Sequence, residues 1–251
     1  GEDAIDSQNF GPTEHWMTSI DPNTGQVRGA LDAMSFSLHD GQMAHMDALC
    51  HYATQRDGQA IIFNGYPQNL NSDGCSGNLS VEDMGPGYVT RGILVDMPLL
   101  RGVAWLEPST PIYVSDLQEW EAFAGVTIRT GDVLLIRGGR WARRVGEGPW
   151  LYGRGGAGLH ASVLPWLKEK GVSLLVSDAV NDVQPSGVEG INRPVHTMTQ
   201  VFIGLPLVDN GYLEDVAREA ARRERWEFMV SWQITPVPNG TASPFNALAT
   251  F

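Results

Sequence analysis

The chain has 251 residues, of which 42% are hydrophobic, and its 17 basic and 29 acidic side chains give a formal net charge of −12. The apolar fraction excludes wholesale disorder, and the negative charge argues against binding nucleic acid or an anionic lipid surface through a general positive field. No apolar run approaches the roughly 20 residues of a membrane-spanning helix, and no secretory signal opens the sequence. We therefore expect a cytoplasmic protein with no membrane or nucleic-acid partner.

Short apolar runs rich in Val, Ile and Leu, each bounded by Gly, Thr, Asp or Pro, predict strands along the chain. Together with an alternating segment at residues 34–38, they lie at residues 93–97, 126–128, 133–136, 172–176 and 228–234. The tripeptide at residues 130–132, Thr-Gly-Asp, predicts a tight turn between two of these strands.

Three stretches predict helices. The first covers about residues 115–125, with Ser115 and Gln118 in capping-box positions and Gly125 as the stop. The second covers residues 161–170, with Pro165 in its first turn. The third covers residues 213–225 and places its apolar residues on one face. Because strands and helices are interspersed, with no repeat or long linker, we predict one mixed α/β domain.

Three of the six histidines lie within thirteen residues, from His39 to His51, together with Asp47. In a helix, residues 45 and 47 would point about 200° apart. In an extended strand, side chains repeat every second residue, so His39, His45, Asp47 and His51 would share one face. Imidazole nitrogens and a carboxylate oxygen aimed at one point suit Zn, Mn or Fe, so the cluster favours a metal site over ordinary surface histidines.

The two cysteines, Cys50 and Cys75, are too few for a disulfide framework, although one bridge stays open. Cys50 adjoins His51 and could act as a nucleophile or a ligand. Strand alternation points it away from His45 and Asp47, so we predict a buried apolar cysteine.

The run His45-Met-Asp47-Ala-Leu-Cys-His51 resembles the signature HxGTHxDxPxH of the cyclase family of metal hydrolases, which includes bacterial kynurenine formamidases, isatin hydrolases and trans-dienelactone hydrolases. Further similar segments follow in the family's order, at residues 158–161, 164–167, 171–178, 182–186, 194–196 and 240–249. Residues 1–33 are poorly matched, so we expect an N-terminal segment and a single cyclase-like domain over residues 34–251. The resemblance implies an α/β swivelling β/β/α domain with a mixed, partly barrel-like β core and helices packed outside, assembled as a homodimer or tetramer.

By the resemblance, His45 and Asp47 are metal ligands, His51 is the catalytic base and His196 is a later ligand. The family then uses a Glu, where this chain supplies Asp209 instead. The family's first histidine would fall at Gly41, and His39, two residues earlier, is the candidate for that position, either as a ligand or as a histidine that orients one.

The resemblance implies an arylformamidase-like hydrolase with Mn or Zn as its divalent metal, cleaving an amide, imide or lactone bond of a small aromatic or cyclic carbonyl compound. A divalent ion lowers the pKa of bound water and polarises a carbonyl, while His51 takes the water proton and returns it to the leaving atom. Trp141, Arg143 and Trp150 could form an aromatic wall with a cationic clamp for the substrate, although a solvated surface loop is an equal alternative.

Other interpretations stay open. His45, Asp47 and His196 could form the facial triad of a non-haem Fe(II) oxygenase, with no role for His51. The departures at Gly41 and Asp209 also fit a degenerate family member that binds a ligand without turning it over. A GxGxxG pattern at residues 153–158 with Asp178 beyond it outlines a dinucleotide-binding fingerprint, but no apolar strand leads into it.

Overall fold

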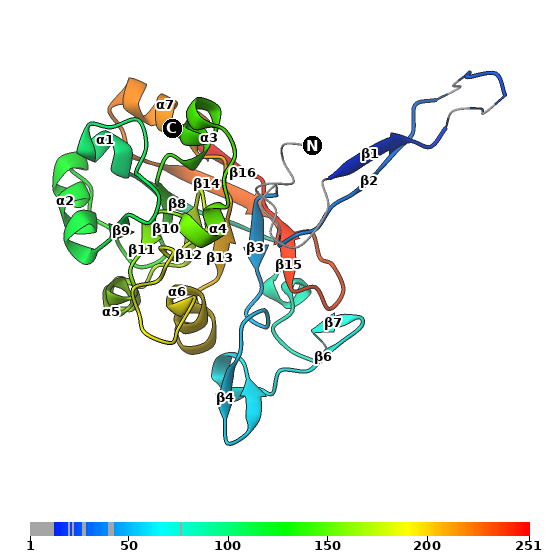
Figure 1. Ribbon diagram of the computed structural model, residues 1–251, viewed down its shortest axis with the longest axis horizontal. Helices are drawn as coiled ribbons and strands as arrows, with labels where there is room; N and C mark the ends of the chain where they lie inside the picture. Colours follow the sequence, from blue (N-terminus) through cyan, green and yellow to red (C-terminus); the bar gives the residue numbers. More distant parts are fainter. Residues whose placement is uncertain (1–12, 20, 22, 27–28, 40–42, 76) are drawn as a thin grey trace.

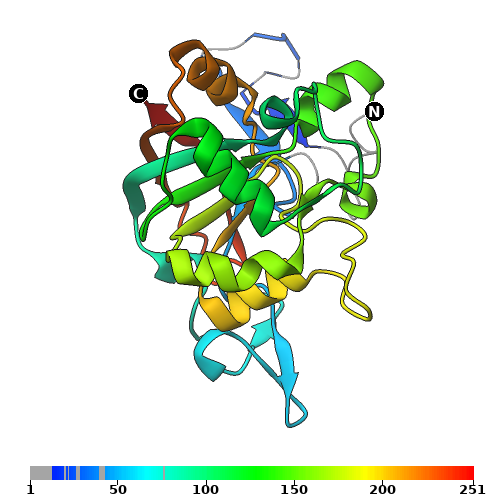
Figure 2. The same ribbon diagram turned by 90° about the vertical axis from the view of Figure 1, so that its left-hand side faces the viewer.

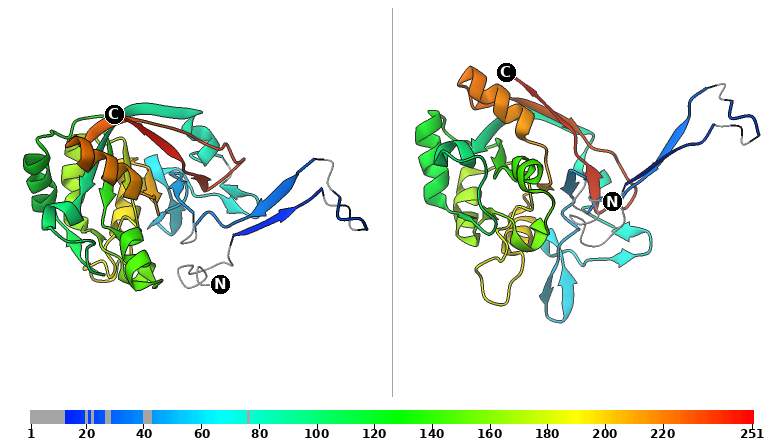
Figure 3. Two further views of the ribbon diagram at one scale, coloured as in Figure 1. Left: turned by 90° about the horizontal axis from the view of Figure 1, so that it is seen from above. Right: turned by 45° about the horizontal axis from the view of Figure 1, so that its top comes forward.

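One mixed sheet of eight strands forms the centre of the molecule (Figure 1). The structure is a computed structural model. It describes residues 13–251 except residues 20, 22, 27–28, 40–42 and 76, and it describes no side chains at residues 153–154. The strands lie in the order β15 (Ala242–Pro244), β3 (His45–Asp47), β13 (Leu207–Asp209), β12 (Leu174–Ser177), β10 (Val133–Arg137), β8 (Gly87–Asp96), β14 (Glu227–Gln233) and β16 (Ala247–Thr250). The four central strands, β13, β12, β10 and β8, are parallel, and antiparallel strands continue the sheet on both sides. The sheet curls into a half-barrel (Figure 3), which confirms the predicted fold class.

The burial of the strands follows from their sequences. β10 and β12 are continuous apolar runs buried along almost their whole length, as expected for parallel strands covered on both faces. β14 instead alternates, with Phe228, Val230 and Trp232 buried and the intervening residues more exposed. The core therefore lies between the central strands and the helices packed against them.

Helices form the second layer, outside the sheet (Figure 2). They are α1 (Met97–Arg101), α2 (Val114–Ala124), α3 (Arg140–Glu147), α4 (Tyr152–Gly155), α5 (Leu164–Lys170), α6 (Pro194–Thr197) and α7 (Glu214–Arg223). Short 3-10 turns occupy Phe63–Gly65 (η2), Val81–Met84 (η3) and Ala161–Val163 (η4), and a π-helix spans Met198–Ile203 (η5). Trp120 of α2 is fully buried and packs edge-on against Trp226, with ring centroids 5.2 Å apart.

Four two-stranded sheets complete the described chain. They pair β1 (Glu14–Met17) with β2 (Asp32–Ser35), β4 (Thr54–Arg56) with β5 (Gln59–Ile61), β6 (Leu70–Asn71) with β7 (Gly74–Cys75), and β9 (Pro111–Ile112) with β11 (Gly158–Leu159). The β1–β2 hairpin projects away from the body as an arm (Figure 1). Among the described residues, no helix is both long enough and apolar enough to cross a membrane.

Most predicted elements are present, and the exceptions have physical causes. Residues 126–128 form no strand, because the Ile128 amide donates to the Glu121 carboxylate and the Thr127 carbonyl accepts from Arg91. The first helix is capped by Tyr113 and Asp116. Its start therefore lies two residues before the predicted capping box at Ser115. The strand predicted at residues 34–38 ends at Ser35, where its partner β1 begins.

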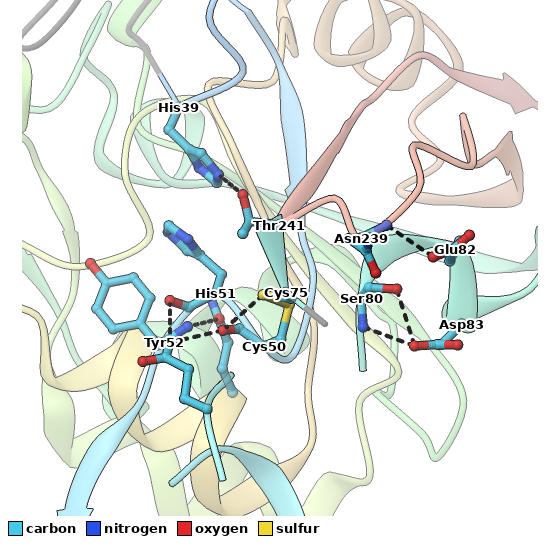
Figure 4. Close-up of a disulfide and its surroundings, with 12 residues drawn as sticks. His39, Cys50, His51, Tyr52, Cys75, Ser80, Glu82, Asp83, Asn239 and Thr241 are labelled. Carbon is cyan, nitrogen blue, oxygen red and sulfur yellow. Dashed lines mark hydrogen bonds between the residues drawn. A yellow bond between two sulfur atoms is a disulfide. The ribbon is translucent and has the colours of Figure 1, made fainter. Parts of the chain in front are cut away.

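Cys50 and Cys75 form a disulfide, the one bridge that the sequence left open, and Cys50 is buried as predicted. Cys50 does point away from the histidine cluster, as alternation predicted. It points instead at the β6–β7 hairpin, which folds back to bring Cys75 beside it (Figure 4).

Candidate metal centre

The histidine cluster lies around β3, the second strand of the sheet. β3 contains only His45–Asp47, and it lies between β15 and β13 with His45 opposite Asp209. The expectation that His39, His45, Asp47 and His51 share one strand face is therefore wrong, because His39 lies in a turn before β3 and His51 in a bend after it. The chain folds both histidines back onto the strand. Gly41, at the family's first histidine position, lies outside the described residues.

One carboxylate oxygen marks the centre of the site. Asp47 is buried, and its Oδ1 has no hydrogen-bond partner among the described residues. His39 Nδ1 lies 3.4 Å and His45 Nε2 3.6 Å from this oxygen. The three ligand atoms lie within 4.8 Å of one another. Since a buried oxygen without a donor is costly, and two imidazoles with one carboxylate suit a divalent cation, these residues fit a metal ion.

The other nitrogen of each imidazole is already engaged, which orients the rings. His45 Nδ1 lies 2.9 Å from the Met43 carbonyl, and His39 Nε2 lies 3.0 Å from Thr241 Oγ1. A hydrogen bond to one ring nitrogen leaves the other free as a ligand atom, as in many metal sites. The free nitrogens are the two that face Asp47.

Gln200 holds the second oxygen of Asp47, and sequence reasoning missed it. Gln200 is fully buried, and its Nε2 donates to Asp47 Oδ2 at 2.9 Å. It lies in the π-helix η5, an irregularity that is frequent at functional sites. No spacing signal links residues 47 and 200, so only the fold brings them together.

His196 and Asp209 lie beside this group and pair with each other. His196 Nε2 is 3.2 Å from Asp209 Oδ2 and 3.8 Å from Asp47 Oδ2, and its Nδ1 is 2.5 Å from Asp182 Oδ2. Asn181 donates to Asp209 Oδ1 at 2.7 Å. Asp182 and Asn181 are further residues that the sequence analysis did not single out, although residue 182 lies in a matched segment.

Charges explain how this buried pair ionises. Burial opposes a charged His196, but the carboxylates of Asp209 and Asp182 outweigh it and raise the His196 pKa well above its usual value. Burial likewise opposes ionisation of Asp209, and the charge and hydrogen bond of His196 outweigh it and lower the Asp209 pKa. The metal-free pair is therefore an imidazolium and a carboxylate.

His51 lies beside His39 in the cluster (Figure 4). Its ring stacks on His39, with centroids 4.0 Å apart and planes 8° apart, and its Nε2 lies 3.9 Å from Asp47 Oδ2. Burial lowers the His51 pKa to about 4, more than the charge of Asp47 raises it. His51 is consequently neutral at pH 7 and able to accept a proton.

Asp47 and Tyr52 respond to the same surroundings. Burial opposes ionisation of Asp47, but the neighbouring imidazoles of His51, His39 and His45 outweigh it and lower the Asp47 pKa. The Tyr52 ring lies 4.9 Å from that of His51 and 5.1 Å from that of His196, and burial raises the Tyr52 pKa. The site thus combines an ionised carboxylate with a neutral phenol.

The proposed substrate residues lie in a helix and the loop after it, because residues 140–147 form α3 where a loop was expected. Trp141 of α3 donates its Nε1–H to the Gly211 carbonyl at 2.9 Å, two residues after Asp209. The Arg143 guanidinium lies over the Trp150 ring, 4.5 Å from its centroid. The contact of Trp141 is therefore with the segment after β13, and Arg143 and Trp150 contact each other.

The GxGxxG segment takes another structure. Residues before Gly153 form α3 and a loop, and Gly158 enters β11. Asp178 accepts hydrogen bonds from the amides of Gly138, Gly139 and Arg140, so it caps the start of α3. This arrangement differs from a dinucleotide-binding unit, in which a strand leads into the first glycine.

The Cyclase family model, described as "Putative cyclase", matches residues 7–181, and the chain therefore belongs to this family. This confirms the resemblance found in the sequence. No curated protein shows a significant sequence match to the chain.

Solved structures share the fold. A crystal structure of a novel cyclase is 24% identical with a TM-score of 0.78, covering 96% of this chain and 80% of the other. Isatin hydrolase A from Ralstonia solanacearum is 19% identical with a TM-score of 0.63, covering 96% and 83%. A predicted metal-dependent hydrolase from Bacillus stearothermophilus is 13% identical with a TM-score of 0.53, covering 94% and 86%. At such identities the likeness is one of fold.

Proposed function

We propose that this protein is a metal-dependent hydrolase that cleaves an amide, imide or lactone bond of a small aromatic or cyclic carbonyl compound. The observation that carries the proposal is Asp47 Oδ1, a buried carboxylate oxygen that faces two imidazole nitrogens and accepts no hydrogen bond from the part of the chain that the structure describes. The shared fold with isatin hydrolase and with a metal-dependent hydrolase supports it.

In this proposal His39, His45 and Asp47 hold the divalent ion, Mn or Zn, with His196 and Asp209 beside them. The bound ion supplies Lewis-acid activation of a water molecule and of the substrate carbonyl. His51 is neutral at pH 7 and stands next to the group, so it takes the water proton and returns it to the leaving nitrogen or oxygen. Gln200 keeps Asp47 oriented by holding Oδ2.

Trp141 and the Arg143–Trp150 pair are the proposed substrate wall, since aromatic faces and a guanidinium suit an aryl or carboxylate-bearing compound. The hydrogen bond from Trp141 to Gly211, two residues after Asp209, supports the assignment of Trp141. Substitution Arg143→Ala should raise the KM for an anionic substrate more than for a neutral one.

The test is metal quantification on protein purified without chelators, paired with hydrolysis of N-formylkynurenine, isatin and a dienelactone. Stoichiometric Mn or Zn with turnover under anaerobic conditions is the expected result. The variant His51→Ala should lose turnover while retaining metal, and His15→Ala, which changes an exposed histidine on β1, is the matched control.

The same experiment separates the competing functions. Bound iron with oxygen-dependent turnover would replace the hydrolase by an oxygenase using His45, Asp47 and His196. Metal-loaded protein that binds these compounds without turning them over would establish a ligand-binding family member instead.

We further propose that the protein works as a homo-oligomer. The projecting β1–β2 hairpin exposes Trp16, Leu31 and Met34, and an isolated two-stranded hairpin needs a surface to pack against. Size-exclusion chromatography with light scattering should report a dimer or tetramer, and Trp16→Ser should shift it towards the monomer.

A further inference from the structure

The disulfide joins the turn that carries His51 to a hairpin at the periphery of the molecule (Figure 4). Cys50 directly precedes His51, and Cys75 ends β7, 25 residues further along the chain. Both cysteines are buried, at 1% and 3% exposure. The bond is therefore internal and lies one residue from the proposed base.

The turn follows β3, which ends at Asp47, so individual hydrogen bonds hold it in place of a strand pairing. They come from four separate segments. The Ala48 amide donates to the Thr241 carbonyl at 2.9 Å, the Cys50 amide to the Leu79 carbonyl at 3.1 Å, and the Tyr52 amide to Gln200 Oε1 at 3.2 Å. Gln68 Nε2 donates to the Cys50 carbonyl at 3.0 Å. Such bonds open individually, whereas the covalent link persists while it stays oxidised.

The other end of the disulfide is firmly anchored. The Cys75 amide donates to the Asn239 carbonyl at 2.8 Å. Gly74 has φ +112°, and a Cβ there would lie 2.2 Å from the Asn239 carbonyl oxygen, so the hairpin tip is packed directly onto this loop. The position of Cys75 is consequently fixed by the backbone of another segment.

This anchor leads back to the histidines. Two residues after Asn239, Thr241 contacts His39 through its Oγ1 at 3.0 Å, and His39 stacks on His51. The connections therefore close a ring that runs from His51 through Cys50 and Cys75 to the 239–241 loop and returns through His39. Opening the disulfide removes the covalent cross-link between the two segments of that ring.

We propose that the Cys50–Cys75 disulfide is a positioning element for His51, which makes turnover depend on the oxidised state of the pair; this inference rests on the proposed function. Reduction by a small dithiol breaks the bond in two exchanges. One reagent thiolate attacks a cysteine sulfur, forms a mixed disulfide and releases the other cysteine. The second reagent thiolate then attacks the reagent sulfur of the mixed disulfide and releases the first cysteine. The dithiol is oxidised to its own disulfide, and Cys50 and Cys75 each become a thiol.

The test compares Cys50→Ala, Cys75→Ala and the double variant with the unmodified protein. Cys75 lies across the bond from the base, so an equal effect of both single variants assigns the effect to the bond and not to the residue next to His51. We expect kcat to fall 10- to 100-fold in all three, as for a displaced catalytic group. Calorimetric Kd values for Mn²⁺ should change less than about threefold, because His45 and Asp47 lie in the paired strand β3.

Hydrogen exchange gives a readout independent of activity. Mass spectrometry of the variants should show exchange at residues 48–52 faster by about tenfold or more, with β12 unchanged as the internal reference. Unchanged exchange and kcat with only a lower melting temperature would overturn the proposal, and so would a parallel loss of metal affinity. Faster exchange in a protein whose unmodified form turns over no substrate would uphold the positioning role and refute the hydrolase.

Discussion

The pKa of His51 predicts how acid destabilises the metal-free protein. Burial lowers this pKa from 6.5 to about 4, more than Asp47 raises it. An unfolded chain therefore binds a proton at His51 near pH 6.5, whereas the folded chain binds it near pH 4. The stability due to the neutral buried imidazole is complete above pH 6.5 and is lost as the pH falls to 4. At 1.36 kcal/mol per pH unit, the loss in free energy of unfolding is about 3 kcal/mol.

Other titrating groups of the site act outside this range. The raised pKa of His196 makes its contribution complete below pH 6.5 and lost only as the pH rises towards that higher pKa. The lowered pKa values of Asp47 and Asp209 make their contributions complete above 3.8 and lost below it. Between pH 6.5 and 4, therefore, His51 is the group of these four that changes the free energy of unfolding.

Urea unfolding of chelator-treated protein measures the effect. The free energy of unfolding of the unmodified chain, minus that of His51→Gln, should fall by about 3 kcal/mol between pH 7 and pH 4. Subtraction cancels the contribution to the free energy of unfolding from the carboxylates that both proteins contain. Parallel pH curves for the two proteins would refute the reasoning and show that the buried imidazole carries no such penalty.

Three other predictions test the ligands and the packing around them. Asp47→Asn should abolish calorimetric binding of Mn²⁺, because it replaces the oxygen that faces both imidazoles. Gln200→Leu should weaken the same binding 10- to 100-fold, since it leaves Asp47 Oδ2 without its donor. Gly158→Ala places a Cβ 2.7 Å from the Asp182 carbonyl carbon, so urea unfolding should show a loss of about 1–3 kcal/mol.

Local sequence patterns were sufficient where neighbouring residues decide the structure. The apolar runs at 133–136 and 172–176 predicted strands, and the His-x-Asp spacing predicted that His45 and Asp47 share one face of β3. The predicted strand at 126–128 failed because its polar backbone groups are satisfied by side chains, which residue propensity does not reveal.

Contacts between distant segments were beyond this reasoning. Gln200 of the π-helix contacts Asp47, and Asp182 contacts His196 of α6, 14 residues further along the chain. The disulfide needed the hairpin geometry of β6 and β7, which two cysteines 25 residues apart do not specify. Metal ligands could thus be proposed from a motif, whereas the residues that orient them required the fold.

The position of β15 has a consequence for how the protein matures. Residues 39 and 241 are 202 positions apart in the sequence, yet Thr241, just before β15, contacts His39, and β15 pairs with β3. The imidazole of His39 is therefore oriented only after residue 241 has left the ribosome. Until β15 is added, one edge of β3 is unpaired, so metal capture follows the synthesis of this strand, and a nascent chain without it is exposed to edge-to-edge aggregation.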